Sequence, residues 1–120
     1  IFFSLIEASN SLDAGVIYLQ KKVNIPKNIL FQEIKKIQLS TNLKLIIKFL
    51  KKIKTNKTID GIKQKGKSTF YTMRSAKDSY INIDKSIKSQ FNLLRICDPI
   101  NYPAYFKYKN RTYIIKIFSK

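Results

Sequence analysis

A long stretch of helical periodicity between residues 28 and 53 constrains the fold more than any other feature of this sequence. Large apolar residues recur there at intervals of three and four, the spacing that places side chains on one face of an α-helix. They are Leu30, Phe31, Ile34, Ile37, Leu43, Ile46, Ile47, Leu50 and Ile53. Asn28 is suited to cap the helix, and the run Ser40-Thr41-Asn42 interrupts the pattern. We predict one long helix over 28–53 with a single buried face and a kink or break near residue 41.

Two β-strands are predicted before this helix. Residues 1–7 are rich in large apolar side chains and predict a buried strand. Residues 15–23 predict a second strand, and Pro26 ends it because proline cannot donate a hydrogen bond to a strand ladder. The small and polar residues from Glu7 to Asp13 indicate a loop between the two strands.

A linker and a second helix are predicted after the long helix. Residues 54–67 lose all periodicity and contain two glycines, which is typical of a loop or linker. Asp84 is suited to cap a short helix over residues 85–96, and Pro99 follows its end. Its inward groups are expected to be Ile87, Phe91, Leu94 and the apolar stem of Arg95.

A hairpin is predicted at the end of the chain. Residues 104–108 and 113–118 alternate as strands around a turn at 109–111. The whole pattern predicts an α/β chain in three parts: residues 1–53, a linker at 54–67, and a small helix-plus-hairpin subdomain at 68–120.

The charge of the chain allows two interpretations. The sequence has 120 residues with a net charge of +17, which would suit a phosphate-rich partner such as nucleic acid or anionic lipid. The basic residues, however, are 21 Lys and only 3 Arg, and Lys, Ile and Asn together make up 50 residues. A protein that reads phosphates or bases would be expected to use more Arg, whose planar fork makes bidentate contacts. We therefore expect the charge to be mostly incidental and a nucleic-acid partner to be unlikely.

Few side chains in this sequence suit metal or disulfide chemistry. Cys97 is the only cysteine and histidine is absent, so we expect no disulfide, no metal site and a buried, reduced thiol. No apolar run approaches the roughly 20 residues of a membrane span, and we expect a cytoplasmic protein. The sequence begins at Ile1 inside an apolar run, and we interpret the chain as a C-terminal fragment.

Asp13 is the carboxylate with the most site-like setting. It lies at the end of a loop, two positions before Gly15, where a backbone can approach a ligand closely. An Asp-Ala-Gly sequence also commonly caps its own turn, so the local sequence leaves both roles open.

Three segments carry a resemblance to a known family. They are SLIEASNSLDAGVIYLQKKVNI around Asp13, RSAKDSYINIDKSI, and FNLLRICDPINYPAYF, and together they cover about half the chain. They resemble the formyltransferases that use 10-formyltetrahydrofolate, and in particular the branch that acts on amino groups of nucleotide-linked sugars. The second segment departs from the family pattern at two positions, with Ala76 in place of proline and Asn82 in place of aspartate.

The resemblance implies a fold, a reaction and a set of site residues. It implies the C-terminal part of a Rossmann-like formyltransferase core followed by a short helix and a β-hairpin. Asp13 would act with an upstream asparagine and histidine in managing the proton of the attacking amine, and the cofactor would lie against Leu12, Asp13 and Gly15. A sugar-nucleotide site would draw on Asn92, Arg95, Tyr102, Pro103, Ala104 and Phe106, for which packing is the alternative role. A homodimer would form through the C-terminal hairpin.

Two other functions remain open. A methionyl-tRNA formyltransferase would share the Asp13 segment but continue into a C-terminal barrel, for which the 53 residues after Lys67 are too few. A small basic nucleic-acid-binding protein would interleave aromatic and cationic side chains on one sheet face, which Tyr105, Lys107, Lys109 and Arg111 do only in part. We expect the sugar N-formyltransferase.

Overall fold

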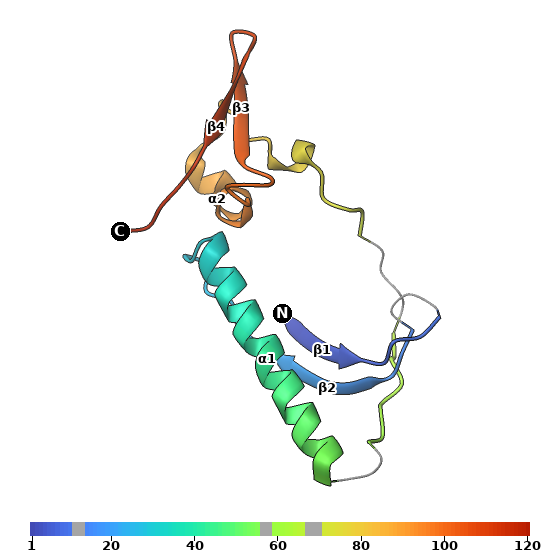
Figure 1. Cartoon of the computed structure of the whole chain (residues 1–120). Coiled ribbons are helices and arrows are strands. Elements are labelled where there is room, and N and C mark those ends of the chain that lie inside the picture. Colours follow the sequence, from blue (N-terminus) through green and yellow to red (C-terminus); the bar gives the residue numbers. More distant parts are fainter. Residues whose placement is uncertain (11–13, 56–58, 67–70) are drawn as a thin grey trace. The chain divides into compact units, whose positions relative to one another are not determined.

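The computed structural model describes residues 1–10, 14–55, 59–66 and 71–120 (Figure 1). Its elements follow in the order β1 (Phe2–Ile6), β2 (Ile17–Lys22), α1 (Phe31–Thr55), a 3₁₀ turn η1 (Ala76–Ser79), α2 (Ile87–Ile96), β3 (Ala104–Tyr108) and β4 (Arg111–Ile115). This mixture of strands and helices confirms the predicted α/β class. The described chain forms two compact units, residues 1–25 with 36–69 and residues 26–35 with 70–120. The three-part division at residues 53 and 67 stays a prediction.

The first unit contains an antiparallel pair of strands. β1 and β2 pair in register from Phe2 opposite Lys22 to Leu5 opposite Leu19, with an irregularity before Ile6. Both strands were predicted, but β1 is not buried: alternate residues are exposed, and Phe2 keeps 59% of its surface in solvent. A two-stranded sheet has two faces, and only one of them is partly covered here.

Gly15 allows the chain before β2 to pack closely against the end of β1. A Cβ atom at Gly15 would lie 2.0 Å from the carbonyl oxygen of Glu7, a separation that real side chains do not adopt. The amide of Glu7 donates to the carbonyl of Val16 at 2.9 Å, which fixes this approach. Gly15 is therefore required by the packing of the backbone itself.

The predicted linker makes specific contacts with β2. The backbone groups of Ile62 and Ile17 exchange two hydrogen bonds of 2.8 and 2.9 Å, although residues 59–66 form no regular strand. The side-chain amide of Gln64 donates to the carbonyl of Gly15 at 2.8 Å. This segment therefore extends the backbone pairing around the start of β2.

α1 begins later than predicted and uses a different cap. Asn28 lies in a turn and the helix starts at Phe31. The carboxylate of Glu33 accepts a hydrogen bond from the amide of Leu30 at 2.9 Å, so the cap comes from inside the first turn. A carboxylate at this point also interacts favourably with the positive end of the helix dipole.

α1 is continuous through residue 41 and runs straight in Figure 1, so the predicted kink or break is wrong. The hydroxyl of Ser40 donates to the carbonyl of Ile37 at 3.0 Å, which satisfies this polar group within the helix. Thr41 is buried because it lies on the face that packs inward.

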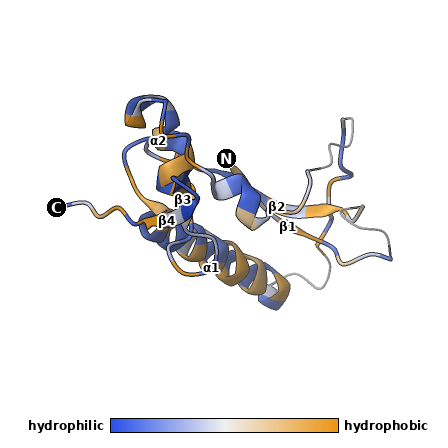
Figure 2. Ribbon diagram, turned by 90° about the horizontal axis from the view of Figure 1, so that it is seen from above, coloured by the Kyte–Doolittle hydropathy of each residue, from blue (hydrophilic) through white to orange (hydrophobic). Residues whose placement is uncertain are grey.

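The predicted buried face of α1 is wrong in its second half. Thr41 and Leu45 are buried, and the ring of Phe49, one turn further along, lies 5.1 Å from that of Tyr18 in β2. A second apolar stripe remains 44–71% exposed, and Figure 2 shows apolar residues on more than one side of the helix. The stripe consists of Leu39, Leu43, Ile46, Ile47, Leu50 and Ile53. The helix has two apolar faces, and the sequence alone did not distinguish them.

The second unit has a small core. Ile81, Leu94, Cys97 and Ala104 are each less than 10% exposed, and Leu93, Ile115 and Ile117 pack against them. The core therefore joins the segment after η1, the helix α2 and the hairpin. The prediction that Cys97 is buried is confirmed.

α2 starts two residues later than predicted. Ser86 is its cap, accepting a hydrogen bond from the amide of Ser89 at 3.2 Å. Asp84 lies in the preceding turn, where its amide donates to the side chain of Asn82 at 2.8 Å. Ile87 was expected to face inward but is 69% exposed, because the helix begins at this residue.

The C-terminal hairpin has a shorter turn than predicted. β3 has the predicted bounds, but β4 covers 111–115 rather than 113–118. Lys109 and Asn110 have positive φ angles of 43° and 60°, as in the two-residue turns whose twist suits antiparallel strands. Arg111 therefore pairs with Tyr108 and belongs to the strand.

We predict that Gly15→Ala destabilises the first unit by about 2 kcal/mol, because the added methyl group displaces the backbone of Glu7. Urea denaturation followed by circular dichroism measures the change. Ala14→Ser, which adds one atom at the exposed neighbouring position, is the matched control and should change stability little. Equal stability of Gly15→Ala and wild type would contradict the close packing at this glycine.

Candidate functional site

The structure describes only part of the expected cofactor site. Leu12 and Asp13 lie outside the described residues, so their roles stay predictions. Gly15 is buried, and the space beside it is filled by Glu7 rather than open to a ligand. Gly15 is the one described member of the expected cofactor site, so the folate contact itself stays a prediction.

A buried hydroxyl joins three segments of the second unit. Ser79 in η1 is fully buried, and its Oγ donates to the carbonyl of Tyr102 at 3.0 Å. The guanidinium of Arg74 donates to the same Oγ at 3.1 Å and to Sγ of Cys97 at 3.3 Å. The Cys97 thiol donates in turn to the carbonyl of Leu93 at 3.2 Å. These contacts connect the RSAKDSY segment to the end of α2 and to the loop before β3.

Asp78 holds the start of the same segment. Its carboxylate accepts from the amide of Ser75 at 2.7 Å and from the Ser75 hydroxyl at 3.1 Å. Both bonds lower the pKa of Asp78 from its ordinary value, and the bond from the Ser75 backbone amide has the larger effect. The arginine, aspartate and serine of this segment therefore have a clear structural role in this chain.

Asp98 shapes the loop that carries Tyr102 and Pro103. Its carboxylate accepts from the side-chain amide of Asn101 at 2.9 Å and from the backbone amides of Ile100 at 2.9 Å and Asn101 at 3.2 Å. These bonds lower the pKa of Asp98 from its ordinary value. The bond from the Asn101 side chain has the largest effect. The amide of Tyr102 closes the loop by donating to the carbonyl of Asp98 at 3.2 Å.

Arg95 and Asn92 are brought together on α2. Nε of Arg95 donates to Oδ1 of Asn92 at 3.1 Å, and Nη1 donates to the carbonyls of Pro26 and Ile29 at 3.1 Å each. The guanidinium therefore stabilises the segment that leads into α1. A pyrophosphate would have to compete with these acceptors or use the remaining donors of the group.

The other predicted substrate residues have different surroundings. Ala104 is 1% exposed in the core, and Pro103 is half-buried beside it in sequence. Phe106 stacks on Tyr113 across the hairpin, with ring centroids 5.2 Å apart. The side chain of Tyr102 is 41% exposed, and this aromatic residue remains accessible to a ligand.

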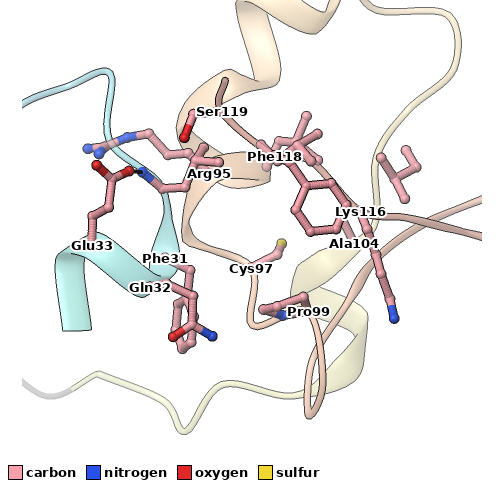
Figure 3. Close-up of a pocket in the computed structure, with 14 residues that line it drawn as sticks. Phe31, Gln32, Glu33, Arg95, Cys97, Pro99, Ala104, Lys116, Phe118 and Ser119 are labelled. Carbon is pink, nitrogen blue, oxygen red and sulfur yellow. Dashed lines mark hydrogen bonds between the residues drawn. The ribbon is translucent and has the colours of Figure 1, made fainter. Parts of the chain in front are cut away.

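A cavity of about 200 Å³ lies within the second unit (Figure 3). Its walls are mainly apolar and include Phe31, Leu94 and Ala104, with Cys97 among them. Arg95 and Glu33 also line it, but both are engaged with backbone groups. Figure 3 shows the Phe118 ring beside Ala104 and the Lys116 side chain extending away from it. Of the predicted substrate residues, Arg95 and Ala104 are part of this lining.

Asn92 instead belongs to an open polar hollow beside α2. Tyr80, Asn82, Lys85, Ser89, Gln90 and Leu93 line the hollow with it. The amide group of Gln90 is held by the backbone of Asn82, with bonds of 2.7 and 2.9 Å. Tyr80 is 41% exposed, so the hollow presents an aromatic ring together with a lysine and an amide.

Sequence reasoning did not identify several of these residues. Tyr80 and Lys85 were not among the predicted site residues, because the hollow depends on the turn between η1 and α2. Arg74 and Ser79 belong to a segment that resembles the family, but the sequence gave no signal of their contacts with Cys97 and Tyr102. No helix in the described part of the chain is long and apolar enough to cross a membrane.

We predict that Arg95→Lys lowers stability by about 1–2 kcal/mol, because a lysine ammonium cannot reach three acceptors in the geometry of the guanidinium fork. Urea denaturation measures the change. The control is Arg111→Lys on the exposed hairpin strand, which should be close to neutral. Equal effects of the two substitutions would contradict the structural role of Arg95.

The 98–102 loop should be sensitive to acid. Because the folded pKa of Asp98 lies below the ordinary value of 3.8, its stabilising contribution is present above that value and is lost as pH falls through the folded pKa. We expect the amide NMR signals of Ile100 and Asn101 to shift at pH values below 3.8 in the wild type. The Asp98→Asn variant should lack this transition, and an identical transition in that variant would exclude Asp98 as its source.

Comparisons with known proteins identify the fold. No family model matches the sequence, and no curated protein matches it significantly. The structure is similar to that of a methionyl-tRNA formyltransferase from Clostridium thermocellum, with a TM-score of 0.67 and 20% sequence identity. The match covers 92% of this chain and 47% of that chain, so this chain spans about half the length of its structural neighbour. At this identity the likeness concerns the fold alone: the chain has the α/β fold of the C-terminal part of a formyltransferase.

Proposed function

We propose that this chain is part of an N-formyltransferase that transfers a formyl group from 10-formyltetrahydrofolate to the amino group of a nucleotide-linked sugar. The observation that carries the proposal is the fold, which matches a formyltransferase over 92% of the chain with a TM-score of 0.67. The three segments that resemble the family lie within this fold and support the same activity. A cytoplasmic location accompanies the proposal, and the unpaired Cys97 is consistent with it.

The acceptor is proposed from the C-terminal segment. NYPAYF resembles the corresponding segment of the sugar N-formyltransferases. The polar hollow beside α2 supports a nucleotide-linked substrate, because Tyr80 offers a ring for base stacking and Lys85 offers a cation for phosphate. Asn92 in the same hollow offers an amide for hydrogen bonds.

Methionyl-tRNA is the second candidate acceptor. The specific observation in its favour is that the structural neighbour acts, by its title, on methionyl-tRNA. The net charge of +17 is also compatible with an RNA substrate. Formylation assays that offer the same intact enzyme a nucleotide-linked amino sugar and methionyl-tRNA distinguish the two acceptors directly.

Asp13 has the central role in the proposed chemistry. A protonated amine has no lone pair, so a base must hold or remove its proton before the amine attacks the formyl carbon. The cofactor supplies the formyl group. In the proposed enzyme, Asp13 manages the amine proton together with an asparagine and a histidine from a segment outside these 120 residues. This chain alone is therefore expected to show no formyl transfer.

We predict that Asp13→Asn in the intact enzyme lowers turnover roughly 10²-fold or more, as expected when a positioned acid–base group is lost. Folding should change little because the two side chains have equal size. Folate-dependent formylation of a nucleotide-linked amino sugar measures turnover, and thermal unfolding checks the fold. Asp84→Asn, which changes an exposed carboxylate in the turn before α2, is the control. Normal turnover of Asp13→Asn would remove this residue from the mechanism.

A further inference from the structure

The cavity of the second unit adjoins the apolar core. It has a volume of about 200 Å³, and three of the four core residues, Leu94, Cys97 and Ala104, form part of its wall. Side chains that border such a space lose the contacts that a packed neighbour would give them, which costs stability. A compact molecule that fits the space therefore supplies contacts that the core residues do not make among themselves.

The walls of the cavity are apolar and include two aromatic rings. Ile115 and Ile117, both half-buried, continue the wall beyond the core residues. Phe31 contributes a ring from the first residue of α1, and Phe118 contributes another from the segment after β4. Phe118 is 84% exposed, so its side of the cavity lies at the surface and gives access from solvent (Figure 3). Because aromatic rings pack favourably against one another in offset or edge-on arrangements, these walls favour a flat aromatic ligand.

The polar side chains of the lining offer little to a charged ligand. The carboxylate of Glu33 accepts from the amide of Leu30 at 2.9 Å, and Nη1 of Arg95 donates to two backbone carbonyls at 3.1 Å each. The Lys116 side chain extends away from the space (Figure 3). A buried charge, or a buried polar group without a hydrogen bond, costs free energy. The cavity therefore selects against a carboxylate and also against a nucleobase, whose ring carries donors and acceptors of its own.

We propose that this cavity is a binding site for a small, uncharged aromatic molecule, about the size of a benzene ring with a short substituent. An apolar cavity of roughly 150 Å³ with walls of Leu, Ile and Phe is known to bind benzene, so the space here is sufficient for such a ligand. The ligand lies against α1, α2 and the residues that follow β4, and its binding stabilises the folded second unit by mass action.

This site is separate from the polar hollow beside α2, with which it shares no lining residue. Arg95 and Ala104 were expected to contact a sugar nucleotide, but the cavity that they line favours an uncharged ring. The inference goes beyond the proposed function and does not rest on formyltransferase activity. The exposed stripe of α1 is the other apolar surface on which a hydrophobic molecule could adsorb, and the experiment must distinguish the two.

A titration of the full chain with three flat probes tests the site. Toluene and benzoate share a ring but differ in charge, and thymine is an uncharged ring with hydrogen-bonding groups. We expect toluene to shift the amide NMR signal of Ala104 saturably, with a dissociation constant of about 1 mM or lower. Nuclear Overhauser contacts should join toluene to the methyl groups of Leu94 and Ile117. Absence of saturation, contacts to Leu50 of α1 instead, or equal binding of benzoate or thymine would each overturn the proposal.

Substitutions at the wall test the location independently. Ile117→Trp places a larger side chain in the cavity and should weaken toluene binding at least about tenfold, because the indole and the ligand cannot fill the same space. Ile114→Trp makes the same change at an exposed position of β4 outside the lining, and affinity should stay within about twofold of wild type. Circular dichroism verifies that both variants fold. Equal affinities of the two variants would place the bound toluene elsewhere and overturn the proposal.

A third variant tests whether the chain fills the cavity with its own side chain. Phe118→Ala removes an exposed ring from the mouth and should weaken toluene binding about threefold, because one aromatic contact is lost. Tighter binding in this variant would mean that the Phe118 ring competes with toluene for the space. The cavity would then belong to Phe118 rather than to a free ligand, and the proposal would be overturned.

Discussion

The second unit depends on the buried hydroxyl of Ser79. A hydroxyl without solvent is costly unless it is hydrogen-bonded, and this one both donates to Tyr102 and accepts from Arg74. The bonds join the segment from Arg74 through η1, the end of α2 and the loop before β3, which lie up to 28 residues apart in sequence, from Arg74 to Tyr102. The core residues Ile81, Cys97 and Ala104 follow these three segments, so the polar contacts and the apolar packing specify the same arrangement.

Much of the fold could be predicted because its signals are local. The alternation of residues 104–108 correctly predicted the bounds of β3. The three-and-four spacing of apolar residues correctly predicted that a long helix, α1, is present. The ends of elements could not be predicted as well, because competing polar residues lie near each of them. Ser86 rather than Asp84 caps α2, and Glu33 rather than Asn28 caps α1. The choice depends on contacts that only the folded chain provides, such as the Asn82 side chain that accepts from the amide of Asp84.

The candidate site was harder to predict than the fold. Arg95 and Asn92 were chosen as substrate residues, and the structure shows them bonded to each other, with Arg95 also bonded to the carbonyls of Pro26 and Ile29. A residue type that suits phosphate binding also suits the stabilisation of carbonyl groups, and sequence cannot separate the two roles. The hollow that contains Tyr80 and Lys85 arises from a turn whose shape follows from the bonds of Gln90, a residue with no recognisable motif.

The partial burial of α1 has a thermodynamic consequence. The heat capacity of unfolding increases with the apolar surface that unfolding exposes to water. The stripe from Leu39 to Ile53 is already largely hydrated in the folded chain, and few residues elsewhere are fully buried. This chain should therefore unfold with a smaller heat-capacity change than its length of 120 residues would suggest, and its stability should vary less steeply with temperature on both sides of the maximum.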